Sequence, residues 1–378
     1  MPRRGIQVHS AQSGMKTTDG LRIGVAGVGY WGSKHVRTMR SLNSVSKVAV
    51  IDPSEERIAK LRHSFPEVDT YPDLESALPA IDALVVATPP STHAPLARAA
   101  MEAGKHVLVE KPFATRLQDA HRMVEMSREC GVVLMVGHTF EYHSAVWALR
   151  EMVTRGDLGD LYYLDTSRLN LGLYQHDVNV LFDLAPHDIS ILNYVLGSTP
   201  TSVECWGSRH AHRRLEDIAY LRVCYDEPHV EANVHVSWLD PCKVRRMTLV
   251  GSSKMVVFDD LEGEERIRVH NKGVSQPDDS ADLTMPPMSY RYGEVVAPYL
   301  VVNEPLLVED EHFVDCVLTG MHPLTDGANG LAVVEVLEAA QLSMKEHREV
   351  FIEEVRRSMR NGLDHLPGRS ALVRQEAV

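Results

Sequence analysis

A glycine-rich segment near the start of the chain constrains the fold most. The run "LRIGVA" at residues 21–26 has the composition of a buried β-strand, and "GVGYWG" then places three glycines in a G-x-G-x-x-G arrangement before a stretch with helical spacing. In such a turn the first glycine permits the tight bend, the second lets the backbone approach a pyrophosphate, and the third allows close helix packing. Because a helix N-terminus offers N–H donors to phosphate, the segment predicts a dinucleotide site. Its predicted cofactor-binding residues are Gly27, Val28, Gly29, Tyr30, Trp31 and Gly32.

An aspartate at the end of the next strand-like run indicates which dinucleotide. Asp52 follows Gly32 by about 20 residues, the spacing at which a carboxylate accepts hydrogen bonds from the adenosine ribose hydroxyls. The same charge repels a 2′-phosphate, and no Lys or Arg follows until Arg57. The sequence therefore predicts NAD rather than NADP.

The pattern along the chain predicts an α/β protein with two different sheets. Strand-like runs at 21–27, 46–52, 82–88, 105–110 and 132–138 alternate with helical segments at 57–65, 95–103 and 117–130, which is typical of a parallel sheet. The pattern fades after about residue 140. A helix is expected over 181–197, followed by strands at 201–209, 219–226, 230–238, 245–251, 254–260 and 266–272. Short polar turns between them favour hairpins of a large, mainly antiparallel open sheet in an α+β domain.

The remaining segments set the expected domain limits. Residues 271–289 are rich in Pro, Asp and Ser and are expected to form a loop, and two helices are expected over 307–319 and 330–347. We expect a flexible tail at 1–20, an NAD-binding domain at 21–140, a substrate-binding and oligomerisation domain at 141–350 and a C-terminal extension at 351–378.

Composition excludes several classes of partner. The formal net charge of −13 disfavours a nucleic-acid surface, which needs a basic field. No stretch approaches the roughly 18 consecutive apolar residues of a membrane span. The five cysteines form no C-x-x-C pair, which predicts buried, reduced thiols in a cytoplasmic protein without a structural zinc site.

A family resemblance rests on residues 85–114, "VVATPPSTHAPLARAAMEAGKHVLVEKPFA", with its "EKP" motif, and on a later D-x-x-x-H segment. From about residue 21 to 347 the chain resembles the Gfo/Idh/MocA oxidoreductases, the group of glucose-fructose oxidoreductase and inositol 2-dehydrogenase. The resemblance implies a Rossmann domain followed by an α/β domain whose open sheet commonly forms an oligomer interface, hence a homodimer or homotetramer. It also implies NAD(P)-dependent oxidation or reduction at a sugar or cyclitol carbon.

The resemblance assigns roles to single residues. It implies that Lys111, Asp183 and His187 are catalytic and that the peptide bond before Pro112 is cis. The further cofactor contacts that it implies are Thr88, Pro89, Ser91, His93, Glu110 and Lys111.

The residues themselves agree with these roles. Lys111 directly follows a strand, at the carboxyl end where open α/β sheets bind ligands. Asp183 lies four residues before His187, so both side chains share one helix face, and Pro186 is expected in the first helical turn. We expect Lys111 to stabilise an alkoxide-like oxygen while neutral His187 accepts the hydroxyl proton.

Two segments depart from the family pattern and leave the substrate open. "GHTFEYHSA" carries Glu141 and Tyr142 where many members have an arginine pair, and "GLYQHDVNVLF" replaces a glycine cluster. The substrate is expected among sugars, sugar phosphates, nucleotide sugars and cyclitols. Its predicted contacts are Lys111, Tyr142, Arg168, Asn170, His176, Asn179, Asp183 and His187.

Two other function classes remain open at this level. Some relatives with the same fold serve as cofactor-binding sensors or regulators, which do not need the lysine, aspartate and histidine together. Alternatively, Asp183 and His187 with the His176–Asp177 pair have spacing that permits a hydrolytic metal site. We expect no metal, because nicotinamide supplies the redox step, and the H-x-H pair His210 and His212 lies in an arginine-rich turn.

Overall fold

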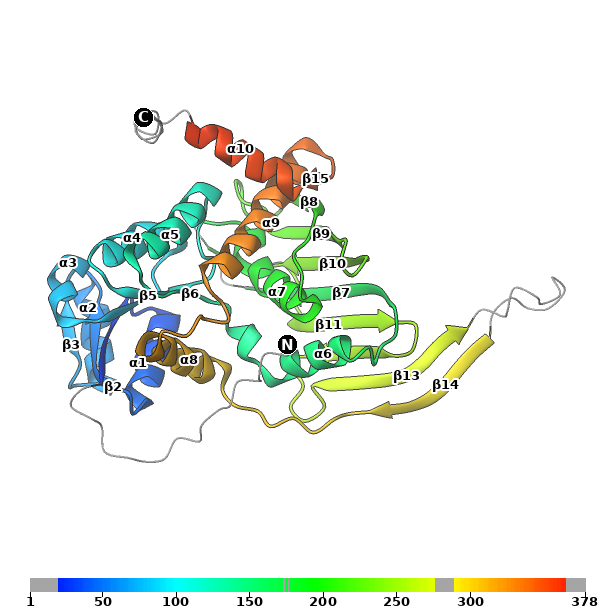
Figure 1. Ribbon diagram of the computed structural model, residues 1–378, viewed down its shortest axis with the longest axis horizontal. Helices are drawn as coiled ribbons and strands as arrows, with labels where there is room; N and C mark the ends of the chain where they lie inside the picture. The colour runs from blue at the N-terminus through cyan, green and yellow to red at the C-terminus, as the bar shows by residue number, and fades with distance from the viewer. Residues whose placement is uncertain (1–19, 173, 176, 276–288, 365–378) are drawn as a thin grey trace, which may run out of the picture. The chain divides into compact units, whose positions relative to one another are not determined.

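The computed structural model describes residues 20–172, 174–175, 177–275 and 289–364, which form two compact units (Figure 1). The first unit runs up to Thr115 and adds Asp119–Ser144 and Val302–Leu331. The second contains Arg116–Gln118, Ala145–Val301 and the chain from Ala332 onward. The predicted tail at 1–20 lies almost entirely outside the described residues, as do His176 and most of the predicted loop.

A six-stranded parallel sheet forms the centre of the first unit. Its strand order is β3-β2-β1-β4-β5-β6, and the expected α/β Rossmann domain with a parallel sheet is confirmed. All four residues of β4 and of β6 are buried, as expected for strands covered on both faces. The strands are β1 (Leu21–Ala26), β2 (Val45–Ile51), β3 (Asp69–Tyr71), β4 (Ala83–Val86), β5 (His106–Glu110) and β6 (Leu134–Gly137).

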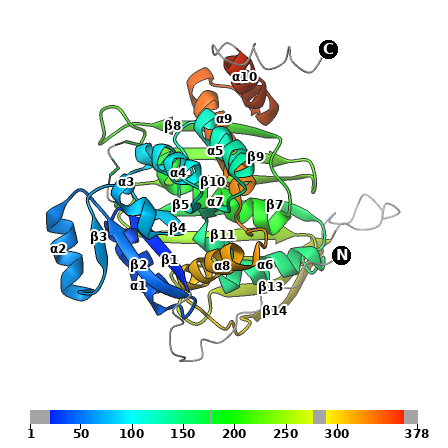
Figure 2. The same ribbon diagram turned by 60° about the vertical axis from the view of Figure 1, so that its left-hand side comes forward.

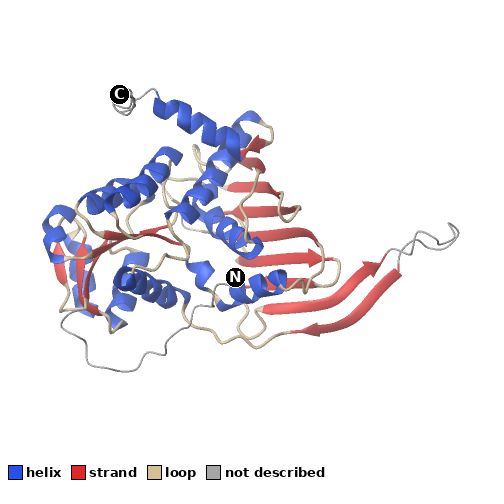
Figure 3. Cartoon of the chain, viewed as in Figure 1, coloured by secondary structure: helices blue, strands red, loops and turns tan. Residues whose placement is uncertain are grey.

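Helices cover both faces of this sheet (Figure 3). They are α1 (Tyr30–Ser41), α2 (Glu55–Ser64), α3 (Leu74–Ala77), α4 (His93–Glu102), α5 (Leu117–Cys130) and α8 (Pro305–Thr319), with short 3-10 turns at Leu78–Ala80, Pro90–Thr92 and Thr139–Tyr142. The helix α8 packs against α1 although it follows some 260 residues later in the chain. The expected boundary at 140 therefore misplaced residues 302–331, because buried side chains of α8 bond to α1 rather than to the elements next to them in sequence.

A nine-stranded sheet forms the second unit, in the order β14-β13-β12-β11-β7-β10-β9-β8-β15. Among the described strands of this sheet, only β7 and β10 pair in parallel, so the predicted mainly antiparallel sheet is confirmed. The strands are β7 (Leu161–Leu169), β8 (Ser202–Ser208), β9 (Ile218–Tyr225), β10 (Val230–Ser237), β11 (Val244–Gly251), β12 (Met255–Asp259), β13 (Ile267–Ser275), β14 (Ser289–Val296) and β15 (Val350–Phe351). The remaining helices are α6 (Ser144–Thr154), α7 (Val180–Leu196), α9 (Gly327–Glu346) and α10 (Ile352–Asp364).

Side chains of the middle strands alternate between two environments. On β10, for example, Val230, Ala232 and Val234 are buried, and α7 packs against this strand and its neighbours β7 and β9 (Figure 2). The intervening residues point to the opposite face, where Trp206, Tyr220 and His235 form a continuous stack of rings across β8, β9 and β10. One face therefore forms the core of this unit, and the other presents aromatic side chains.

Four strands, β3, β7, β14 and β15, were missed by the sequence analysis. The core-facing positions of β7 hold Leu164, Thr166 and Arg168, so the alternation of apolar residues is broken at the centre of the sheet. At the sheet edge, β13 continues to Ser275 and β14 begins at Ser289, so the ends of the predicted 271–289 loop are strand. The part between them, 276–288, lies outside the described residues.

Two further expectations need correction. Pro186 lies in the second turn of α7 rather than the first, because the helix already begins at Val180 with Asn179 as its N-cap. The cysteines were expected to be buried, but of the five free thiols only Cys205 and Cys316 are; Cys224 is half-buried, and Cys130 and Cys242 are exposed. Among the described residues, no helix is long and apolar enough to cross a membrane.

Candidate active site

The three glycines of the β1–α1 turn differ in what surrounds them. Gly27 has φ +82°, and a Cβ there would lie 2.7 Å from the carbonyl oxygen of Ala87. A Cβ on Gly32 would overlap the carbonyl oxygen of Gly27. Around Gly29, by contrast, a Cβ would meet nothing within 4 Å, and its φ of −69° is open to any residue. The protein itself therefore requires glycine at 27 and 32 but leaves open space beside Gly29.

The N-terminus of α1 faces this open space with its donors uncapped. Gly29 is the N-cap residue and supplies no side-chain cap hydrogen bond, and the first turn contains no acidic residue. The ammonium of Lys34 lies 4.4 Å from the ring centroid of Tyr30 and 5.0 Å from that of Trp31, and both rings are exposed. A helix N-terminus without a side-chain cap, a nearby cation and room for a bulky group fit the pyrophosphate of a dinucleotide.

Asp52 lies at the carboxyl end of β2 and is buried. Its carboxylate accepts hydrogen bonds from the backbone N–H groups of Val28, at 3.0 Å, and Ser54, at 2.8 Å. The guanidinium of Arg57 lies 3.6 Å from the same carboxylate. The aspartate thus joins the glycine turn to the end of the second strand.

The loop after β4 is held in place by a buried histidine. The ring nitrogens of His93 lie 2.9 Å from the carbonyl oxygen of Pro112 and 2.8 Å from that of Thr88. Burial lowers the pKa of His93. Thr88 is half-buried, while Pro89 and Ser91 are exposed on the same loop. His93 therefore fixes this loop against the segment that carries Lys111.

Glu110 and Lys111 end β5 at the same carboxyl edge of the sheet. Lys111 is half-buried, and the Lys111–Pro112 peptide bond is cis, as the resemblance implied. The carboxylate of Glu110 accepts from the backbone N–H of Lys111 at 3.1 Å and lies 3.1 Å from Nε2 of His35. His35 was not predicted as a site residue.

His138 is a second site residue that the sequence analysis missed. It follows β6, whose Gly137 pairs with Glu110, so it lies at the carboxyl edge next to Lys111. Its side chain is buried, and neither ring nitrogen has a hydrogen-bond partner among the described residues. Burial lowers the pKa of His138 to about 4, with Glu110 opposing and Lys111 reinforcing this shift. Its place directly after a strand was the signal that could have identified it.

In the second unit, α7 carries Asp183 and His187 one turn apart. Oδ2 of Asp183 accepts from Nε1 of the buried Trp238 at 3.0 Å. Both Asp183 and His187 are partly exposed, whereas most of α7 is buried. The predicted pair therefore occupies an accessible part of a largely buried helix.

The other predicted substrate contacts in this unit have structural partners. Asn179 caps α7 through the N–H of Phe182 and donates to Glu216 at 2.9 Å. Arg168 forms a buried bidentate pair with Asp188 at 2.7 and 3.2 Å, which ties β7 to α7. Asn170 is half-buried just beyond the end of β7.

Tyr142, in the first unit, is also enclosed. Its hydroxyl lies 3.1 Å from Oγ1 of Thr325, and burial raises the pKa of Tyr142 well above its usual value. The buried phenol of Tyr142 thus helps to hold residues 302–331 against the rest of the first unit.

No group of three His, Cys, Asp or Glu side chains in the described part of the chain is arranged to hold a metal ion. The turn around His210 and His212 is organised by Asp217, which accepts from the backbone N–H groups of both histidines and of Ala211. The H-x-H pair is thus part of a hydrogen-bonded turn.

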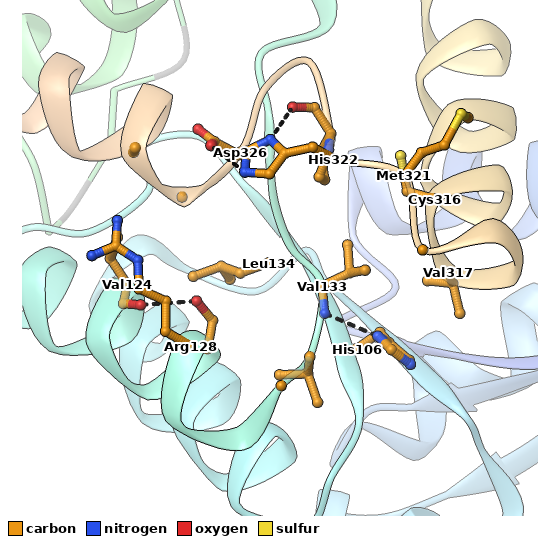
Figure 4. A pocket seen from close by; sticks show the side chains of 17 residues that line it. His106, Val124, Arg128, Val133, Leu134, Cys316, Val317, Met321, His322 and Asp326 are labelled. Atoms are coloured by element: carbon orange, nitrogen blue, oxygen red, sulfur yellow. Dashed lines mark hydrogen bonds and ion pairs between the residues drawn. The ribbon is translucent and has the colours of Figure 1, made fainter.

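A cavity of about 380 Å³ opens at the opposite edge of the parallel sheet (Figure 4). His106 and Leu134, at the amino ends of β5 and β6, line it together with Arg128, Cys316 and Asp326. It contains none of the predicted site residues. Ligands of open α/β sheets bind at the carboxyl edge, so this cavity is not the cofactor site.

A Gly-rich turn before an uncapped helix, an acid after the second strand and a lysine after the fifth define a dinucleotide-binding oxidoreductase. Comparison with known families agrees. Residues 21–138 match the model of the oxidoreductase family with an NAD-binding Rossmann fold, and residues 146–257 match the GFO/IDH/MocA C-terminal domain. Together these segments span more than half of the chain, which therefore belongs to the Gfo/Idh/MocA oxidoreductase family.

Relatives of known activity cover nearly the whole chain. UDP-N-acetylglucosamine 3-dehydrogenase of Acidithiobacillus ferrooxidans is 27% identical over 334 residues, covering 88% of this chain and 99% of that enzyme. Myo-inositol 2-dehydrogenase of Thermotoga maritima is 25% identical over 348 residues, covering 89% and 99%. The crystal structure of GenD2 from gentamicin A biosynthesis, in complex with NAD, superposes with a TM-score of 0.75 at 23% identity over 91% of this chain and 99% of that one, which shows the common fold.

Proposed function

We propose that the protein is an NAD-dependent dehydrogenase that oxidises, or reversibly reduces, a ring secondary alcohol of a sugar, sugar phosphate, nucleotide sugar or cyclitol. The observation that carries this proposal is the carboxyl edge of the parallel sheet. There the open space beside Gly29 and the uncapped N-terminus of α1 share an edge with Lys111. The names of the relatives, which specify a nucleotide sugar and a cyclitol, support the substrate class.

The residues of the first unit fit the binding of NAD. The first-turn N–H groups of α1 would hold the pyrophosphate, and Asp52 would accept from the adenosine ribose. The loop with Thr88, Pro89 and Ser91 would lie along the cofactor, with His93 as its anchor. When bound, the nicotinamide supplies the acceptor or donor of the hydride.

Asp52 is the reason that we propose NAD over NADP. Its buried carboxylate would lie close to a 2′-phosphate, and desolvated like charges repel strongly. Arg57, whose guanidinium lies 3.6 Å from Asp52, is already paired with that carboxylate. NADP-dependent relatives exist in the family, so the preference is a property to be measured on this chain.

Three side chains would act on the substrate. Lys111, as an ammonium group, would stabilise the oxygen as it gains alkoxide character, and neutral His187 would accept the hydroxyl proton. Asp183, oriented by Trp238, would accept from a neighbouring hydroxyl. A sensor of the same fold would not need these three groups together, which is why we favour catalysis.

The surroundings of the other predicted substrate contacts indicate two different roles for them. Asn170 remains our candidate for a direct contact. Because Tyr142, Arg168 and Asn179 already bond inside their own units, we propose that they shape the binding surface rather than touch the substrate.

We further propose a cytoplasmic homodimer or homotetramer that forms through the open face of the nine-stranded sheet. The ring stack of Trp206, Tyr220 and His235 presents aromatic surface there, and Trp206 is 55% exposed. Aromatic clusters are typical of the centres of protein interfaces. Trp206→Glu should shift the mass measured by analytical ultracentrifugation to that of the monomer, and an unchanged mass would contradict this interface.

The function is tested by a substrate panel of free sugars, sugar phosphates, nucleotide sugars and inositols, with NADH formation followed at 340 nm. Lys111→Met should lower kcat by on the order of 100-fold or more, while the Kd for NADH changes little. Lys105→Met, at an ordinary position before the same strand, serves as the matched control. Near-normal turnover by the Lys111 variant would remove the lysine from the mechanism.

A further inference from the structure

A fully buried histidine on α1 lies between two carboxylates from distant parts of the chain. His35 is 0% exposed, and its Nδ1 lies 2.8 Å from Oδ1 of Asp310 on α8. Its Nε2 lies 3.1 Å from Oε1 of Glu110 at the end of β5. The second oxygen of Asp310 accepts from the hydroxyl of Thr38, one turn further along α1. Three elements therefore meet at one imidazole.

The hydrogen bonds of this cluster require a charged ring. A neutral imidazole has one N–H and could satisfy only one carboxylate, whereas the imidazolium donates to both. Burial alone would lower the pKa of His35, but the charge and hydrogen bonds of Asp310 and Glu110 raise it well above the usual value. Conversely, burial opposes ionisation of Glu110, and the bonds to His35 and the charge of Lys111 lower the pKa of that carboxyl.

A third carboxyl group, that of Glu309, lies next to this cluster. Glu309 precedes Asp310 on α8, and burial and the charge of Glu110 raise its pKa well above the usual range. Its Oε2 accepts from the hydroxyl of Thr139 at 2.9 Å, so Glu309 bonds to a different partner from the two carboxylates that contact His35.

The cluster reaches Lys111 through Glu110. One carboxylate oxygen of Glu110 takes the bond from His35, and the other accepts the backbone N–H of Lys111. The opposite side of this carboxylate lies against Gly137, where a Cβ would stand 3.2 Å from both Cα and Oε2 of Glu110. The glycine on β6 thus leaves the space that this orientation of Glu110 needs.

We propose that His35, held by Asp310, is a positioning residue that fixes the carboxylate of Glu110 and, through it, the Lys111 backbone from which the catalytic ammonium projects. The inference rests on the role of Lys111 in the proposed function. It gives α8 a function as well, because a helix from the far end of the sequence supplies the second carboxylate. None of the three groups His35, Asp310 and Thr38 needs to touch the substrate or the cofactor.

The test combines a spectroscopic measurement with kinetics. In protein labelled with ¹⁵N-histidine, both ring nitrogens of His35 should show imidazolium shifts at pH 8, where an exposed histidine is neutral, with His35→Gln used to assign the signals. A neutral His35 ring at pH 8 would overturn the proposal without any reference to activity.

In the kinetic arm, His35→Gln should lower kcat by about 10- to 100-fold on the substrate found in the panel, with the Kd for NADH within about threefold of wild type. Arg37→Gln is the matched control: it removes an exposed ion pair to Glu304 that also joins α1 to the start of α8, and it should leave kcat unchanged. Melting temperatures of both variants separate loss of positioning from loss of fold.

A double-mutant cycle tests whether His35 acts on Lys111 through Glu110. If His35 acts through Glu110, the variant His35→Gln/Glu110→Gln should be no slower than Glu110→Gln alone. Multiplicative losses would show that His35 acts independently and would overturn the inference. If Lys111→Met is slow but His35→Gln is not, the inference fails alone; if Lys111→Met retains turnover, the proposed function fails as well.

Discussion

Replacing Gly29 by alanine should weaken cofactor binding without weakening the fold. The added Cβ would meet no protein atom within 4 Å, and the backbone φ of −69° suits alanine. At an N-cap position, alanine lowers the stability of the protein relative to glycine by a few tenths of a kcal/mol to about 1 kcal/mol. Alanine also lowers the conformational entropy of the unfolded chain, which stabilises the folded state by about 0.4 to 1 kcal/mol. The free energy of unfolding should therefore change by less than about 0.8 kcal/mol, and the melting temperature by less than about 3 °C.

The loss of affinity follows from the same geometry. The methyl group would occupy the space in front of the uncapped α1 N-terminus and would hold a phosphate away from its donors. A hydrogen bond to a charged group contributes about 1.5 to 3 kcal/mol, so the loss of one such bond corresponds to roughly a 10- to 100-fold increase in the Kd for NADH. Titration of NADH fluorescence and thermal melting of the same sample measure both quantities.

Gly32→Ala provides the opposite control in the same turn. Its Cβ would overlap the carbonyl oxygen of Gly27, and backbone atoms cannot move aside as a flexible side chain can. Overpacking of this kind costs about 1 to 3 kcal/mol, which should lower the melting temperature by several degrees. If Gly29→Ala binds NADH like the wild type, or melts as early as Gly32→Ala, the open space beside Gly29 is not the phosphate site.

Three further outcomes test other parts of the site. Asp52→Ser should narrow the preference for NAD over NADP by about 1 to 3 kcal/mol in the ratio of kcat/KM values, and a wild type that favours NADP would contradict the role of Asp52. His187→Asn should cost about 100- to 10,000-fold in kcat and remove the rise of oxidative turnover with pH, since only a neutral ring accepts the proton; an unchanged pH profile would place the base elsewhere. His138, with its folded pKa lowered to about 4, takes up protons more readily when unfolded, so wild-type stability should fall as the pH drops from about 6.5 to about 4. His138→Phe should lessen this loss, at most on the order of 3 kcal/mol, and equal acid-induced unfolding curves for both proteins would show that the buried ring is not its source.

The parallel sheet was predictable because its strands are apolar on both faces. β4 and β5 appear in the sequence as continuous Val- and Leu-rich runs, and each is followed by a helix with its own spacing. The central strand β7 was not predictable in this way. Its inward-facing Thr166 and Arg168 are polar, and Arg168 is accommodated only because Asp188 on α7 neutralises it, a partner that local sequence does not reveal.

The residues of the site also divide into those that local sequence predicts and those that it does not. Gly27, Gly32 and Asp52 follow from short-range rules, because a turn, a helix contact and a strand end each require a particular residue at a fixed spacing. Pro186 shows the limit of such rules: its placement in the first helical turn was reasonable for an isolated helix. The N-cap Asn179, bonded to Phe182 and to the distant Glu216, begins the helix earlier.

The groups that sequence reasoning missed share a physical property. His35, Asp310 and His138 are all buried, and the environment that makes them informative comes from contacts across the fold. His35 alone would be interpreted as a helix residue near the glycine turn, and Asp310 as one acid among several on α8. Only the distance of 2.8 Å between Nδ1 of His35 and Oδ1 of Asp310 shows that the two groups form a pair in the core, where an unpaired ion would be prohibitively costly. A buried imidazole that is hydrogen-bonded to two carboxylates, one of them on the residue before a proposed catalytic lysine, is therefore a stronger indication of function than any of these side chains taken separately.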